Sequence, residues 1–341
     1  MATYGKLALL LCSLIVLRAD DTQAFHDGSR HTVKFVTVDE HVELEVLDWG
    51  GSGRPVVLLA GSGNSAHVFD GFADKLAEEF HVYGITRRGY GASSLPASGY
   101  GAQRRGDDVL RVLDSLSLTK PVLVGHSLGG TELTALASAY PDRVSGLVYI
   151  DSTADPTFDW SPYEALRRKL PASVNLPRPA WTDFQTFQAY QAWQKRTVGY
   201  SFPESELRSV YFTLKDGSMG PHMTPPRVTE AITAGMGKPD FSRIRVPVLA
   251  FYALPEPLDK QIRRYQPQTP AEREALEQVY AFDVSYSRRI SGSLRDAVPA
   301  ANIVEIPGAN HYMFLSNQEE VLRELRGFVR LLNSSTQAAR R

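Results

Sequence analysis

The stretch Gly125-His126-Ser127-Leu128-Gly129 follows a short apolar run and precedes residues that favour a helix. It fits the pattern G-x-S-x-G, in which a serine sits on a tight strand-to-helix turn and small neighbours let the backbone pass closely. On such a turn the hydroxyl points out of the sheet, where a nearby base can make it a nucleophile. The alternative is a serine that only caps the helix. Chance matches occur on the order of 0.1 times per chain of this kind, so the surrounding sequence must decide.

The segments around this stretch alternate between buried strands and helices. Strands are expected at 55–60, 81–86, 121–125 and 146–150, and helices between them at 69–80, 104–117 and 128–140. Strand, helix, strand in this order predicts a parallel sheet covered by helices on both faces. Two alternating runs at 32–39 and 41–49 predict an antiparallel pair before it.

The alternation stops between residues 152 and 245, where prolines mix with many aromatic residues and no strand is expected. Three of the four tryptophans, Trp160, Trp181 and Trp193, lie in this interval. Strands resume at 246–252 and 301–306, and helices are predicted over 269–297 and 316–332. The first of these helices has a cap, a first-turn proline and an acid in order at its start, in Thr269, Pro270 and Glu272.

The composition is that of an ordinary globular chain, with 341 residues of which 43% are hydrophobic and 22% charged. Such a chain can bury a large core as one domain or as a domain with an insertion. The 37 basic and 38 acidic residues give a net charge of -1, and no long basic stretch is present. Nucleic acid is therefore excluded as an expected partner.

The first residues predict a secretory signal peptide, residues 1–24. Lys6 precedes an apolar run from Leu7 to Leu17, and a polar stretch ends at Ala24, where cleavage is expected. The run is shorter than the roughly 20 residues of a membrane span, so we expect export to the periplasm or the medium and no stable membrane span after cleavage. Cys12, the single cysteine, lies inside this run, which leaves no thiol for disulfides or catalysis.

Three segments occur in the order and at the strand ends that are typical of the α/β-hydrolase family. They are LLAGSGNSAHVFDGFADKLAEEFHVYGITRRGYGASS (58–94), GHSLGG (125–130) and VEIPGANHYMFLS (304–316). The chain resembles this family over nearly all of its length after the leader. The resemblance implies an α/β fold, with a mostly parallel sheet, helices on both faces and a helical lid insertion. It divides the chain into core segments at 25–151 and 246–333 and a lid at 152–245, and a disordered tail is expected at 334–341.

The resemblance also implies roles for four residues. Ser127 matches the nucleophile of the family, and His311 matches its catalytic histidine. An imidazole with an ordinary pKa near 6.5 can take the serine proton and return it to the leaving group. The backbone amides of Leu128 and Ser62 would form the oxyanion hole, which stabilises the charge that develops on the substrate oxygen.

The acid that completes this set has two candidates. The position that most of the family uses follows the strand at 246–252, and here it holds Glu256 without the usual preceding glycine. A minority of the fold takes its acid one strand earlier, where this chain has Asp151. Both preserve the order serine, acid, histidine. The sequence favours Asp151 and leaves Glu256 as the alternative, with Asp259 or no acid as the remaining cases.

Other residues of the matching segments are expected to be structural. His126 occupies a variable position of the serine motif, and His67 lies in a strand-to-helix loop. We expect both to pack in the interior or line the pocket. The stretch 88–91, RGYG, matches a family motif that usually supports the site from behind.

A serine at the turn argues against the haloalkane-dehalogenase and epoxide-hydrolase branches, which have aspartate there. We therefore expect a carboxylesterase that cleaves a small or medium hydrophobic ester through an acyl-enzyme on Ser127. One alternative is an aminopeptidase similar to proline iminopeptidases, which would hold a substrate ammonium with acidic lid residues such as Asp155, Asp159, Glu164 and Asp183. The other is a non-catalytic member that only binds a ligand. The sequence implies no metal and no organic cofactor, and it does not predict an oligomeric state.

Overall fold

The structure is a computed structural model that describes residues 27–152, 158–170, 174 and 177–338. The predicted signal peptide lies outside these residues. Within the described part of the chain, no helix is both long and apolar enough to cross a membrane.

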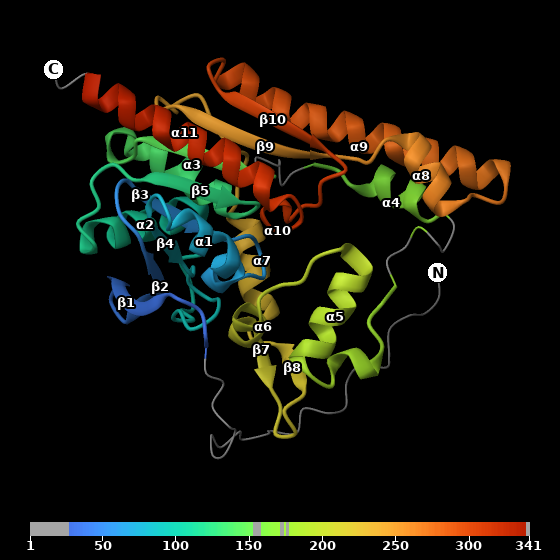
Figure 1. The fold of residues 1–341 in the computed structure, drawn as a ribbon, viewed down its shortest axis with the longest axis horizontal. Helices are drawn as coiled ribbons and strands as arrows, with labels where there is room; N and C mark the ends of the chain where they lie inside the picture. The colour runs from blue at the N-terminus through green and yellow to red at the C-terminus, as the bar shows by residue number, and fades with distance from the viewer. Residues whose placement is uncertain (1–26, 153–157, 171–173, 175–176, 339–341) are drawn as a thin grey trace.

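The core of the fold is an eight-stranded sheet in the order β1-β2-β4-β3-β5-β6-β9-β10 (Figure 1). Its strands are β1 (Thr32–Asp39), β2 (Val42–Gly50), β3 (Pro55–Leu59), β4 (His81–Ile85), β5 (Val122–His126), β6 (Gly146–Ile150), β9 (Val248–Leu254) and β10 (Asn302–Pro307). β1 pairs antiparallel with β2, and β2 with β4. All other neighbours are parallel. The predicted antiparallel pair and the mostly parallel sheet are confirmed.

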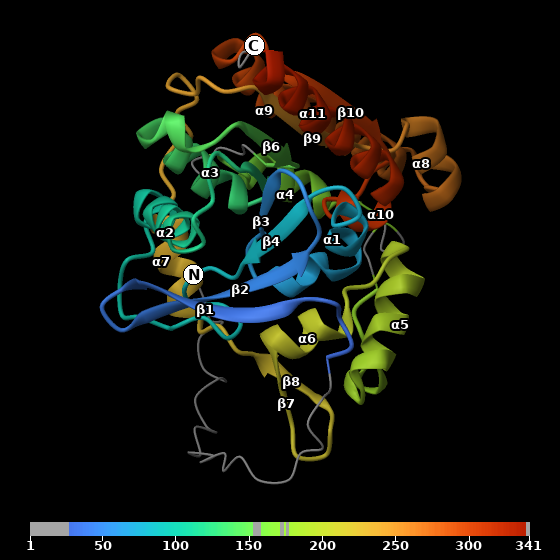
Figure 2. The same ribbon diagram turned by 60° about the vertical axis from the view of Figure 1, so that its left-hand side comes forward.

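Helices cover both faces of this sheet, as predicted. On one face lie α2 (Ala102–Ser115), α3 (Gly129–Ala139) and α9 (Pro270–Ala297), and on the other α1 (Asp70–Leu76) and α11 (Gln318–Ala338). Figure 2 shows α2 on one side of β3 and β4 and α1 on the other. Leu113 and Leu294 are fully buried on the first face, and Phe72 and Leu325 on the second. Burial of each such side chain stabilises the fold by about 1.5–3 kcal/mol.

Both of the predicted C-terminal helices are present, α9 and α11. α9 begins at Pro270 with Thr269 as its cap, as predicted, and Thr269 and Glu272 exchange side-chain to backbone hydrogen bonds. α11 continues to Ala338, past the predicted end of this helix at residue 332 and into the segment for which a disordered tail is expected. No glycine or proline interrupts the chain after Leu332, and extending a packed helix needs no new nucleation. Residues 339–341 lie outside the described part of the chain.

The insertion between β6 and β9 contains helices and one β-hairpin. Its helices are α4 (Ser161–Arg167), the 3-10 turn η4 (Trp181–Phe184), α5 (Phe187–Val198), α6 (Glu204–Val210) and α7 (Pro226–Ala234). β7 (Tyr211–Thr213) and β8 (Met219–His222) pair antiparallel, so the expectation of a strandless insertion is wrong here. The turn of this hairpin includes Asp216 and Gly217. Gly217 supports it with a φ of +81°, and the Asp216 carboxylate supports it by accepting from the Ser218 amide at 3.0 Å.

Four short helical elements complete the described fold. They are η1 (Ala66–Phe69), η2 (Pro141–Arg143), α8 (Leu258–Tyr265) and α10 (Met313–Ser316). Of these, η1 and α10 follow the loops after β3 and β10, which carry residues of the candidate site.

Candidate active site

Ser127 lies on the turn between β5 and α3 with a φ of +49°, which is uncommon for a residue other than glycine. Hydrogen bonds hold this conformation. The Ser127 amide donates to the Ile150 carbonyl at 3.0 Å, and the Ser152 hydroxyl donates to the Ser127 carbonyl at 2.6 Å. A side chain at Gly129 would overlap the Leu59 carbonyl oxygen, so the motif needs glycine there. The predicted strand-turn-helix context of the serine motif is present.

Asp151 and His311 form a close pair. Asp151 directly follows β6, and its Oδ1 accepts from the Ala253 amide at 3.0 Å. His311, in the loop between β10 and α10, has its Nδ1 at 2.6 Å from Asp151 Oδ2. Because a carboxylate only accepts, the Nδ1 carries the proton and the Nε2 is left as the basic nitrogen. The structure therefore brings the favoured acid to the predicted histidine.

Among the described residues, no hydrogen bond or ion pair joins Glu256 to His311. Its carboxylate pairs with the Arg264 guanidinium of α8 at 3.0 Å, and its carbonyl accepts from the Gln261 side chain at 2.7 Å. Asp259, the remaining candidate, pairs with Arg263 on the same helix at 2.6 Å. The Glu256 and Asp259 side chains thus both pair with arginines of α8, which begins at Leu258.

The loop after β3 passes directly against the serine turn. A methyl group at Gly61 would lie 2.8 Å from the Nδ1 of His126 and 3.2 Å from the Cβ of Ser127. Ser62, the next residue, and Leu128, the residue after the serine, both line the same cavity as Ser127. The two predicted oxyanion residues therefore lie on the two segments that border the serine.

A buried arginine fixes this loop. The Arg87 guanidinium donates to the Gly61 carbonyl at 2.7 Å and to the Ala60 carbonyl, and it pairs with Glu132 of α3 at 2.6 Å. Glu132 also pairs with Arg105 at 3.1 Å. This role of Arg87 was not predicted from the sequence. The only signal was the position of Arg87 next to the family-like stretch 88–91.

His126 packs in the interior, in agreement with the expectation. Its ring lies 4.6 Å from that of His311 and 4.8 Å from that of Tyr312, between ring centroids. Its Nε2 lies 3.0 Å from the His311 carbonyl oxygen, to which it donates. Burial lowers the pKa of His126 well below its usual value, so the ring stays neutral. It thereby holds the loop that carries His311.

Arg88, from the RGYG stretch, also has the structural role expected of it. Its guanidinium makes two hydrogen bonds of 2.6 Å to the Asp108 carboxylate, and both side chains are buried. Such a bidentate pair fixes the loop after β4 on α2.

The serine and the histidine line one cavity of about 380 Å³. Its walls also include Leu128, Thr131, Trp160, Ile232, Thr233, Met236, Tyr286 and Ile290, with Ser62, Asp151 and Ser152 near the serine. Among the described residues that line it, none is lysine or arginine. The cavity is therefore mostly apolar away from the Ser127 and His311 side chains.

The fold and its serine turn are those of an α/β hydrolase. Residues 56–324 match the model of the alpha/beta hydrolase family, so the chain belongs to this family. A 2-(acetamidomethylene)succinate hydrolase from Mesorhizobium japonicum is 25% identical over 281 residues, which cover 82% of this chain and 89% of that protein. The protein is thus a hydrolase of the α/β-hydrolase superfamily.

Solved structures show the same fold. The crystal structure of an E-2-(acetamidomethylene)succinate hydrolase superposes with a TM-score of 0.63 at 22% identity, covering 88% of this chain and 99% of that one. An esterase from Exiguobacterium antarcticum superposes with a TM-score of 0.57 at 19% identity, covering 88% and 100%. At these identities the likeness concerns the fold.

Proposed function

We propose that the protein is a serine carboxylesterase that cleaves small or medium hydrophobic esters through an acyl-enzyme on Ser127. The observation that carries the proposal is the Asp151 and His311 pair, joined at 2.6 Å, in the cavity that Ser127 also lines. A serine needs a base to become a nucleophile, and a histidine oriented by a carboxylate is such a base.

In the proposed reaction the Nε2 of His311 takes the hydroxyl proton as the Ser127 oxygen attacks the ester carbonyl. The amides of Leu128 and Ser62 donate to the oxyanion of the tetrahedral intermediate. The carbon–oxygen bond to the alcohol then breaks, and the imidazolium gives the alcohol its proton. A water molecule, deprotonated by His311, attacks the acyl-enzyme and releases the carboxylic acid and the serine.

The walls of the cavity favour a neutral, apolar substrate. Trp160, Ile232, Met236 and Tyr286 offer apolar surface, and none of the described wall residues is a lysine or an arginine. The relative from Mesorhizobium japonicum is named for a succinate derivative, whose carboxylates need cationic partners when they leave water. A hydrophobic ester fits this cavity better than a dicarboxylate does.

The aminopeptidase alternative finds no support in the described cavity wall. Asp159, Glu164 and Asp183 do not line it, and Asp183 instead accepts from the Ala180 amide at 2.8 Å. Asp155 lies outside the described residues. A protein that only binds a ligand would need neither the positive φ of Ser127 nor an oriented histidine, so that alternative is also the weaker one.

A substrate panel tests the proposal. We expect p-nitrophenyl butyrate to be cleaved faster than a p-nitrophenyl hemisuccinate, and L-prolyl p-nitroanilide to stay intact. Ser127→Ala and His311→Ala should each lower kcat by several orders of magnitude without adding to one another, because such residues act as a unit. Ser138→Ala, on the same helix α3, is the control and should keep wild-type activity. Faster cleavage of the anilide, or full esterase activity in Ser127→Ala, contradicts the proposal.

We also propose that the protein is exported and that residues 1–24 are removed. The support is the basic residue Lys6, the apolar run and the cleavage pattern at Ala24 in the leader.

A further inference from the structure

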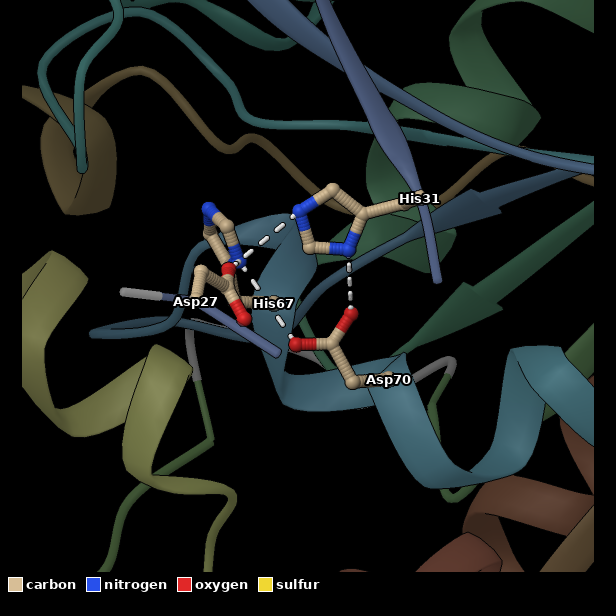
Figure 3. A group of neighbouring side chains, drawn as sticks. All are labelled: Asp27, His31, His67 and Asp70. Carbon is tan, nitrogen blue, oxygen red and sulfur yellow. Dashed lines mark hydrogen bonds and ion pairs between the residues drawn. The ribbon is translucent and has the colours of Figure 1, made fainter. Parts of the chain in front are cut away.

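Four side chains that can bind a metal converge outside the cavity. Asp27 and His31 precede β1, His67 belongs to η1, and Asp70 begins α1 (Figure 3). One ligand atom from each residue lies within 4.8 Å of those from the other three. The chain thus brings two imidazoles and two carboxylates from separate segments to one point.

Three of the six separations between these atoms match those between the ligands of a small cation, and all six lie within 4.8 Å. Asp27 Oδ2 lies 3.4 Å from His31 Nε2 and 3.6 Å from His67 Nδ1, and His67 Nδ1 lies 3.6 Å from Asp70 Oδ2. A tetrahedral zinc ion with bonds of about 2.0–2.2 Å holds its ligands roughly 3.3–3.6 Å apart. A charge-assisted hydrogen bond is shorter, at about 2.7–2.9 Å.

On each histidine, one ring nitrogen lies near a carboxylate oxygen. His31 Nδ1 lies 2.8 Å from Asp70 Oδ1, and His67 Nε2 lies 3.4 Å from Glu45 Oε1. Trp49 also donates to Asp70 Oδ1 at 3.1 Å. A histidine that binds a metal usually donates its other ring N–H to such an acceptor, which orients the ring and fixes its tautomer. The other ring nitrogens, His31 Nε2 and His67 Nδ1, are therefore the ones left to bind a metal.

Two of the four side chains, His67 and Asp70, are buried, and the cluster leaves one polar atom without a hydrogen bond. His67 is 7% exposed, and its Nδ1 makes no hydrogen bond within the described part of the chain. Three carboxylates, Asp27, Asp70 and Glu45, surround the two imidazoles, so the site needs positive charge. That charge can be a metal ion or a proton. Burial by itself lowers the pKa of His67, but the neighbouring carboxylates of Asp70 and Glu45 raise that pKa to about 10, which makes a proton the competing occupant.

We propose that Asp27, His31, His67 and Asp70 bind a divalent transition-metal ion, with Zn²⁺ as the best match to two nitrogen and two oxygen ligands. Imidazole ligands disfavour Mg²⁺ and Ca²⁺. Since the protein supplies all four ligands, the site is structural, unlike catalytic zinc sites, which keep one position open.

The metal would tie the segment before β1 to the start of α1. Asp70 also accepts from the Ser205 hydroxyl of α6, so the same carboxylate connects the site to the insertion. All four ligands follow Ala24, and cleavage of the predicted leader would keep the site whole. The sequence alone implies no metal, because these ligands do not form a familiar spacing motif.

Zinc binding to the purified, untagged protein tests the proposal. After treatment with a chelator and buffer exchange, Zn²⁺ is added in competition with a chromogenic chelator, and bound metal is counted by plasma mass spectrometry. We expect one zinc ion per chain with a Kd below about 1 µM, and X-ray absorption should show nitrogen and oxygen ligands at about 2.0–2.2 Å. No binding by the wild-type protein would overturn the proposal and assign the site to a proton.

Two variants and a control locate the ion. His31→Gln should weaken binding at least 100-fold, whereas His41→Gln, whose side chain is 91% exposed, should bind as the wild type does. Asp27→Asn, at a partly exposed position before β1, keeps the test valid if His31→Gln does not fold, and should bind at least tenfold more weakly. Equal binding by the variants and the control would overturn the proposal. Ester hydrolysis is measured separately, so failure of either proposal leaves the other intact.

Discussion

Replacing Asp151 by asparagine exchanges one carboxylate oxygen for an NH2 group, which removes the negative charge and keeps the shape of the side chain. In the wild type, Oδ1 of Asp151 accepts from the Ala253 amide at 3.0 Å, and Oδ2 accepts from His311 Nδ1 at 2.6 Å. In Asp151→Asn the remaining oxygen must stay on the Ala253 amide, because the opposite orientation would place the new NH2 group against the Ala253 N–H, and both are donors. The new NH2 group then points at His311 Nδ1, which must become an acceptor. The proton moves to Nε2, and the histidine can no longer take one from Ser127.

The expected loss follows from this change of tautomer. The same substitution in a serine protease lowers kcat by about 10⁴-fold with the geometry intact, which corresponds to ~5.5 kcal/mol of transition-state stabilisation. We expect a loss of this order in kcat for p-nitrophenyl butyrate. Circular dichroism and thermal melting should show a folded protein close to the wild type, so that the loss can be assigned to chemistry.

Glu256→Gln is the matched control, since it makes the same chemical change at the other candidate acid. It removes a pair with Arg264, whose side chain is 59% exposed, and such a pair contributes about 0–1 kcal/mol to stability. We expect kcat within about tenfold of the wild type, because Glu256 does not orient the base. If Glu256→Gln abolishes activity while Asp151→Asn stays near the wild type, the assignment of the acid is wrong.

Three further predictions concern the loop after β3, the insertion and the leader. Gly61→Ala should lower kcat at least tenfold and destabilise the fold by ~1–3 kcal/mol, since the methyl group would meet His126 and the serine turn. Gly71→Ala is the control, because open space surrounds that position, and it should have neither effect. Equal effects of the two substitutions would show that close packing at Gly61 does not matter. Burial raises the pKa of Glu206 from 4.5 to about 7, so the folded state holds an extra proton between these values and the free energy of unfolding should fall as pH rises through this window, by up to ~3 kcal/mol. Urea unfolding from pH 4 to 8 measures this slope, and Glu206→Gln should flatten it; an unchanged slope would show that the group does not titrate there. N-terminal sequencing of protein from the periplasm or medium of the native host should begin near Phe25, whereas an intact Met1 on cytosolic protein would disprove export.

The sheet and the serine turn were predictable because their signals are local. Parallel strands buried on both faces, such as β5 and β6, appear as continuous apolar runs, and the small residues around Ser127 mark a tight turn. The acid was not fixed by sequence, because the choice between Asp151 and Glu256 depends on how two neighbouring loops turn. Asp151 takes a φ of +43° and Glu256 precedes a helix, and neither fact follows from strand patterns.

Features that depend on distant residues or very short elements escaped the sequence. β7 and β8 have three and four residues, too few for an alternating pattern to be recognised. The pair of His31 and Asp70 joins positions 39 residues apart, and no spacing rule connects them. Contacts of this kind are set by tertiary packing.

Covalent labelling tests whether Ser127 is the nucleophile of the protein. The protein is incubated with a fluorophosphonate, its intact mass is measured, and the modified residue is located by peptide mass spectrometry. We expect one adduct per chain, on Ser127, formed at the rate at which esterase activity is lost. Labelling should be absent in Ser127→Ala and retained in Ser138→Ala. An adduct on another residue, or esterase activity that persists without any adduct, would contradict this role of Ser127.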